Sequence, residues 1–101
     1  MKAHDFLQRS NETMSERGTQ NGYDSQEERS ASAIAALFNA KTGHNLSEAD
    51  AWSFLICLKE VRLRRQLLNG SDPTDTLIDL VSYQALLAEC ESQKIKTRNE
   101  D

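Results

Sequence analysis

The sequence predicts an all-α protein: a small bundle of three to four helices in which the two long C-terminal helices form an antiparallel hairpin. The chain has 101 residues, enough for one small domain. It contains one Pro and four Gly, too few for the many hairpin turns of a β-sandwich or barrel. Its apolar residues recur at helical intervals. We expect a helical core over 25–93, a weakly ordered segment at 1–24 and a polar tail at 94–101.

Two helices are predicted in the first half of the chain. A short amphipathic helix is expected over 2–17, ending near Gly18 and followed by a loop over 18–24; its apolar residues are Ala3, Phe6, Leu7 and Met14. The second helix begins at Ser25, because Ser25 and Glu28 have the spacing of a capping box. Gly43 is the expected C-terminal stop of this helix.

The two long helices have clearer ends. The third is expected over 48–69, with Ser47 as its N-cap and Gly70 as its stop. In the fourth, Asp72 is the expected N-cap and Pro73 the first helical residue, where the missing N–H costs nothing. The polar tail from Lys94 is expected to fray. The short turn between the two helices makes them antiparallel neighbours.

Composition excludes several classes of function. A net charge of -4 argues against a general nucleic-acid binder. No apolar run approaches the roughly 18 residues of a membrane span, and the N-terminus lacks the apolar core of a signal peptide. Cys57 and Cys90 have no metal-ligand spacing, so reduced thiols and a cytoplasmic location are expected.

Polar residues interrupt the apolar rows of the two long helices. Lys59 shares a row with Trp52, and Arg62 shares one with Leu55; on the fourth helix Asp79 shares a row with Tyr83. One interpretation is an ion pair of Lys59 or Arg62 with Asp79 that fixes the helix register. The other is a ligand pocket in which the cations bind a phosphate or carboxylate and Tyr83 stacks on the ligand or donates to it.

A divalent-metal site is a weaker alternative. Asp75 and Asp79 are one helical turn apart, and Glu27 and Glu28 offer further carboxylates for Mg²⁺. Acidic residues at a helix start also simply complement the helix dipole. No catalytic residue or cofactor is predicted otherwise, because His4 and His44 have no acid or nucleophile at a meaningful spacing.

The apolar faces of the two long helices are broader than one helix pair needs. A chain of this size buries only about 60–65% of its extended surface by folding alone. We therefore expect a homodimer or a higher homo-oligomer that forms through these helices.

Three short motifs carry a resemblance to known proteins. They are ERGTQNG (Glu16 to Gly22), LKEVR (Leu58 to Arg62) and DTLIDLVSY (Asp75 to Tyr83). Their order resembles that in a family of short phage and prophage proteins of unknown function. The helical pattern is also remotely similar to the MazG-like all-α nucleotide pyrophosphohydrolases, which hold Mg²⁺ with Glu-x-x-Glu and Glu-x-x-Asp pairs. Here the later pair is Thr76-x-x-Asp79 and Glu27 adjoins Glu28, so a shared fold implies a degraded metal site.

Three functions are open as hypotheses. The first is a phage-encoded, non-catalytic protein that sequesters a phosphate-bearing, nucleotide-like ligand such as a host defence signal. In it Lys59 and Arg62 meet the phosphates, Asp79 belongs to the same pocket, and Tyr83 and Arg17 close it. The second is a host-protein-binding inhibitor or structural interaction module. The third is a Mg²⁺-dependent nucleoside triphosphate pyrophosphohydrolase that uses the four carboxylates above.

Overall fold

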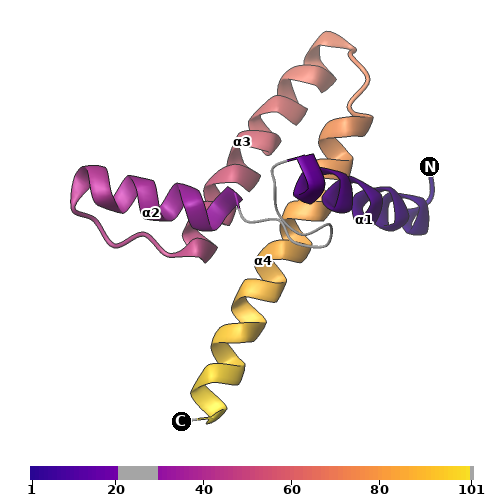
Figure 1. Cartoon of the computed structure of the whole chain (residues 1–101). Coiled ribbons are helices and arrows are strands. Elements are labelled where there is room, and N and C mark those ends of the chain that lie inside the picture. Colours follow the sequence, from indigo (N-terminus) through magenta and orange to yellow (C-terminus); the bar gives the residue numbers. More distant parts are fainter. Residues whose placement is uncertain (21–29, 101) are drawn as a thin grey trace.

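The computed structural model describes residues 1–20 and 30–100, with side chains described over 1–16 and 30–96. These ranges form four α-helices: α1 (Ala3–Gln20), α2 (Ser30–Thr42), α3 (Glu48–Asn69) and α4 (Thr74–Glu100). Figure 1 shows α3 and α4 as an antiparallel hairpin, from which α1 and α2 extend in opposite directions. Helix α1 packs on α4, and α2 packs on α3. The predicted all-α bundle with a C-terminal hairpin is confirmed.

The start and end of α3 are determined by local hydrogen bonds. The Ser47 hydroxyl accepts from the Asp50 amide at 3.0 Å, and the Asp50 carboxylate accepts from the Ser47 amide at 3.1 Å. This reciprocal capping box satisfies two amides that a helix start leaves unpaired. At the other end Gly70 has φ 72°, a left-handed conformation that a residue with a side chain adopts at a cost. Both predicted boundaries of α3 are confirmed.

Gly43 ends α2 in the same way, with φ 74° and its amide donating to the Asn39 carbonyl at 2.9 Å. The side chain of Asn39 then fixes the connection to α3. Its amide nitrogen donates to the Leu46 carbonyl at 2.9 Å, and its oxygen accepts from the Leu46 amide at 2.7 Å. The predicted cap of this helix, Ser25 with Glu28, lies outside the described residues.

Two predicted helix ends differ from the structure. Helix α1 continues through Gly18 to Gln20 instead of ending there, and the rest of the predicted loop, 21–24, lies outside the described residues. A glycine costs a helix only about 1 kcal/mol, and it ends the helix only where it turns left-handed. Helix α4 begins at Thr74, because the Pro73 carbonyl accepts its first helical bond, from Leu77 at 2.9 Å. The Asp72 carboxylate still accepts from the Thr74 amide, at 3.0 Å.

The C-terminal tail, which is predicted to fray, belongs to α4, and this helix extends to Glu100. The segment after Lys94 contains no Gly or Pro, and Lys94 pairs with Glu91 one turn earlier at 3.2 Å. Figure 1 shows this half of α4 projecting beyond the other helices.

The core lies where α2, α3 and α4 meet. Its centre is Trp52, which is 1% exposed. Small residues surround it and let the helix backbones approach closely; the cluster comprises Ala31, Ala35, Ala49, Ala51, Trp52 and Cys90. Helix α2 therefore joins the hairpin through alanines, which leaves its larger apolar side chains on the surface.

Candidate functional site

A polar cluster lies on the seam between α3 and α4. The Lys59 ammonium is 2.7 Å from an oxygen of the Asp79 carboxylate, and the two side chains are only 13% and 9% exposed. The same ammonium lies 5.9 Å from the centre of the Tyr83 ring. That ring in turn lies 5.4 Å from the ring of Trp52. The cluster therefore joins a largely buried ion pair to the aromatic core.

The rows of α3 and α4 explain this arrangement. Lys59 lies one turn after Ile56 and two turns after Trp52, both buried, so its stem enters the seam with them. Asp79 comes three residues after the buried Thr76 on α4 and approaches the same seam from the other side. A cation held among apolar neighbours needs an anion, and Asp79 supplies it.

Three of the five predicted ligand-binding residues are brought together: Lys59, Asp79 and Tyr83. Arg62 is exposed on α3, so the structure pairs Asp79 with Lys59, not with Arg62. The backbone of Arg17 lies in α1, but its side chain is outside the described part of the chain.

The predicted carboxylates are not assembled into a metal site in the described part of the chain. Asp75 is exposed, whereas Asp79 is buried against Lys59. Glu27 and Glu28 lie outside the described residues. Across 1–20 and 30–100, no three His, Cys, Asp or Glu side chains are grouped so that they could hold a metal ion.

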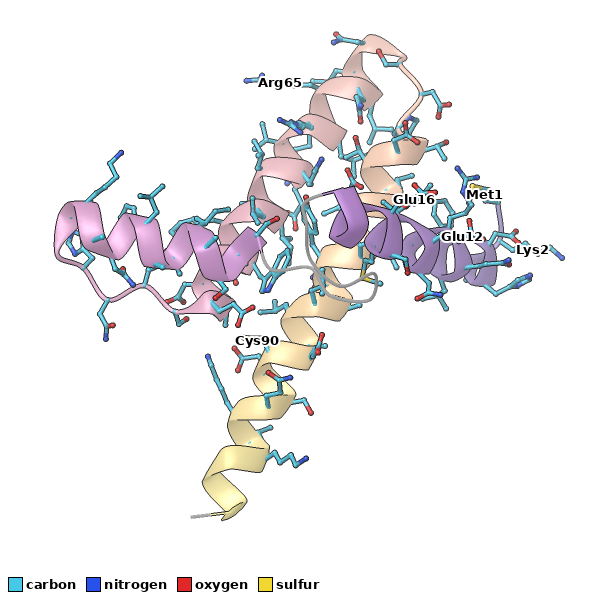
Figure 2. All side chains as sticks on the ribbon, viewed as in Figure 1. Met1, Lys2, Glu12, Glu16, Arg65 and Cys90 are labelled. Atoms are coloured by element: carbon cyan, nitrogen blue, oxygen red, sulfur yellow. The ribbon has the colours of Figure 1, made fainter. Side chains whose placement is uncertain are left out.

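The two cysteines are unpaired and have different environments. Cys57 is exposed on α3, and Cys90 is buried on α4, where Figure 2 labels it. Burial raises the pKa of the Cys90 thiol, and the nearby Glu48 carboxylate, 3.8 Å from its sulfur, raises this pKa further. Cys90 is thus a core residue with a thiol kept protonated, which is the reverse of an activated nucleophile.

A second buried polar contact, which sequence reasoning missed, joins α1 to α4. Ser10 and Ser82 are 2% and 1% exposed. The hydroxyls of Ser10 and Ser82 lie 3.0 and 3.1 Å from the Ile78 carbonyl, and the Ser82 hydroxyl is 3.4 Å from the Ser10 carbonyl. Two small side chains that bond to backbone let the helices cross closely. Their small size was the available signal, but serine at a helix surface is too common to predict a contact.

Two open cavities flank this crossing. The larger, about 480 Å³, is almost wholly apolar, and its walls come from both helices: Ala3, Phe6, Leu7, Leu77, Leu80 and Val81. The smaller, about 310 Å³, is more polar and is lined by Asn11, Met14, Ser15, Ala85, Leu86 and Glu89. Neither cavity is lined by a residue of the Lys59–Asp79 pair.

Large apolar side chains are also exposed along α3. Phe54, Leu58, Val61 and Leu68 are 65%, 45%, 48% and 87% exposed, and the exposed Arg65 falls in the same row. Figure 2 shows Arg65 projecting from α3 on the side away from α4. We call these five residues the α3 outer face. Helix geometry places them opposite the Trp52 and Ile56 row that packs into the core.

No family model, curated protein or solved structure matches this chain. In the described ranges, none of the helices has a stretch long and apolar enough to cross a bilayer. The geometry of the chain's own residues therefore carries the functional argument.

Proposed function

We propose that this chain is a non-catalytic interaction module that self-associates and presents helical surfaces to other proteins. One observation carries the proposal: the α3 outer face exposes four large apolar side chains in a single row. Monomeric proteins expose scattered apolar residues, but a contiguous row of this kind marks an interaction surface. A homodimer is the smallest assembly that covers it.

The size of the molecule supports self-association. The chain exposes 7211 Å², whereas a compact monomer of its mass exposes roughly 5,800 Å². Its radius of gyration is 15.1 Å, compared with about 13 Å for a compact domain of this length. Surface that folding leaves uncovered is available for association.

The polar cluster supports a function without catalysis. Lys59 and Asp79 form an ion pair at 2.7 Å, so a phosphate bound at Lys59 competes with a carboxylate that already occupies this largely buried ammonium. Mg²⁺ at Asp79 competes with the Lys59 ammonium for the same carboxylate. Nucleotide sequestration by a phage protein and pyrophosphate hydrolysis stay predictions, and in both the ligand competes with this ion pair.

A thermal-shift screen distinguishes an interaction module from a protein that binds a nucleotide. The chain is heated with nucleotides and cyclic dinucleotides, with and without Mg²⁺. A ligand of the native state at a hundredfold excess over its Kd adds about 2.7 kcal/mol of stability. The proposal predicts no shift for any of these compounds. A shift that Lys59→Met abolishes while the fold is retained would favour ligand binding instead.

The interaction surface is tested by two matched substitutions of exposed apolar residues. Leu58→Asp places a charge in the α3 outer face, and Ile95→Asp places one on α4, where Ile95 is 58% exposed. Sedimentation velocity should show a monomer for Leu58→Asp and a dimer for both Ile95→Asp and the unmodified chain.

Two free thiols suit a reducing compartment, so we propose that this module acts in the cytoplasm.

A further inference from the structure

The α3 outer face has the spacing of a coiled-coil seam. Phe54, Leu58, Val61, Arg65 and Leu68 succeed one another at alternating intervals of four and three residues. This alternation is the heptad pattern by which a helix packs along a second helix. The face therefore suits a helical occupant better than a flat surface or a small molecule.

We infer that the occupant is α3 of a second copy of this chain, packed antiparallel, with Arg65 of each subunit against the partner subunit's Phe54. The inference rests on the proposed self-association and specifies its face, direction and register. Its evidence is the order of residues along the outer face, the charges along α3 and the area that the molecule leaves exposed.

The register is set by the spacing. When Leu58 faces the partner's Val61 in an antiparallel pair, Phe54 of each helix lies opposite Arg65 of the other, because both are four residues further out. A guanidinium on an aromatic ring is a favourable contact, and the arginine stem covers the ring edge. Arg65, the charged residue in the row, thus contacts the aromatic ring of the partner's Phe54.

The charges along α3 select the antiparallel direction. A parallel pair places the two Arg65 side chains side by side in the seam, where like charges repel. The antiparallel register separates them by eleven residues, or roughly 16 Å along the helix axis.

The surface that the chain leaves exposed is large enough for a dimer interface of standard size. A stable interface of standard size buries about 800 Å² on each partner. The surface of this chain, 7211 Å², exceeds that of a compact monomer by more than this amount. One α3–α3 contact of standard size therefore fits within the surface that folding leaves exposed.

The test uses opposite charges at one exposed position. Phe54→Glu places a carboxylate opposite the partner's Arg65, and Phe54→Lys places an ammonium there. Sedimentation equilibrium should give Phe54→Lys a dimer Kd at least about tenfold weaker than that of Phe54→Glu, since like charges in a seam cost several kcal/mol. Adding Arg65→Glu to Phe54→Lys should restore the dimer. Circular dichroism controls for folding, and Phe54 is exposed enough for both variants to keep it.

The other outcomes overturn the inference in distinguishable ways. Equal weakening by Phe54→Glu and Phe54→Lys indicates a parallel pair, in which position 54 faces itself. No effect of either substitution on a dimer indicates another face and leaves the proposed self-association intact. If the unmodified chain is a monomer at millimolar concentration, both the proposed self-association and this inference are wrong.

Discussion

Breaking the Lys59–Asp79 pair should destabilise the fold by a large fraction of its total stability. Removing one member of a buried pair leaves an uncompensated charge and costs about 3–5 kcal/mol. Since these side chains are 13% and 9% exposed, we expect the lower end, about 3 kcal/mol, for Lys59→Met or Asp79→Asn. A domain of this length has a total of about 5–15 kcal/mol.

The two substitutions should also be strongly coupled. In Lys59→Met/Asp79→Asn neither charge is left unpaired, so the double variant should lose at least about 2 kcal/mol less than the sum of the single losses. Urea unfolding monitored by circular dichroism measures all four free energies of unfolding. The exposed pair of Lys94 and Glu91, 43% and 53% exposed, is the matched control. Its equivalent cycle should give under about 1 kcal/mol.

If the loss of stability in the double variant equals the sum of the two single losses within about 0.5 kcal/mol, the two side chains are not coupled and the prediction is wrong. Single losses as small as those of the control pair would also contradict it, because they would mean that water reaches the charges and screens them.

The remaining predictions concern the core, a cap and the thiols. Trp52→Ala should cost about 3–5 kcal/mol in urea unfolding, because it empties the centre of the core, and Trp52→Phe should cost less. Ser47→Ala should cost about 1 kcal/mol through the lost cap. Hydrogen bonds of the Ser47 backbone amide and then of its side chain hold the pKa of Asp50 below its ordinary value. The stabilisation by the ionised Asp50 carboxylate is therefore present above the unfolded pKa of about 3.9 and is lost as pH falls through the folded pKa. Comparing the urea midpoints of Asp50→Asn and the unmodified chain at neutral pH and near pH 2 tests the sign: the difference between the two midpoints should narrow in acid, where the Asp50 carboxylate is neutral, and a constant difference would contradict it. A thiol reagent at mildly alkaline pH should modify Cys57 at once and Cys90 only on unfolding, and rapid modification of both in the native state would contradict the burial of Cys90.

Local signals predicted the hairpin well. Helix α3 begins after Ser47 and ends before Gly70 as expected, because a cap and a left-handed glycine determine a helix end through hydrogen bonds within a few residues. Gly18 shows the limit of that reasoning: the same residue type lies inside α1, where nothing turns the backbone left-handed. A glycine stops a helix only when the next residues bond back to the last helical turn, and the residue type alone does not determine whether they do.

The candidate site was only partly predictable. Lys59 and Asp79 interrupt apolar rows on neighbouring helices, so their pairing is a consequence of the hairpin. The choice of Lys59 over Arg62 depends on how far each row is rotated into the seam, and that rotation is set by packing around Trp52. The Ser10–Ser82 contact joins helices far apart in sequence, so no local pattern indicates it. The α3 outer face is part of the broad apolar surface that the sequence predicts for the long helices. Only the position of α4 shows which side of α3 stays exposed.

The most direct test of the account is the mass of the unmodified chain in solution, measured by sedimentation equilibrium from micromolar to millimolar concentration. Self-association through α3 predicts a monomer–dimer equilibrium in which the average mass approaches twice the chain mass of 11.4 kDa as concentration rises. A single species of one chain mass across the whole range would contradict it, and the exposed row on α3 would then have no role in self-association.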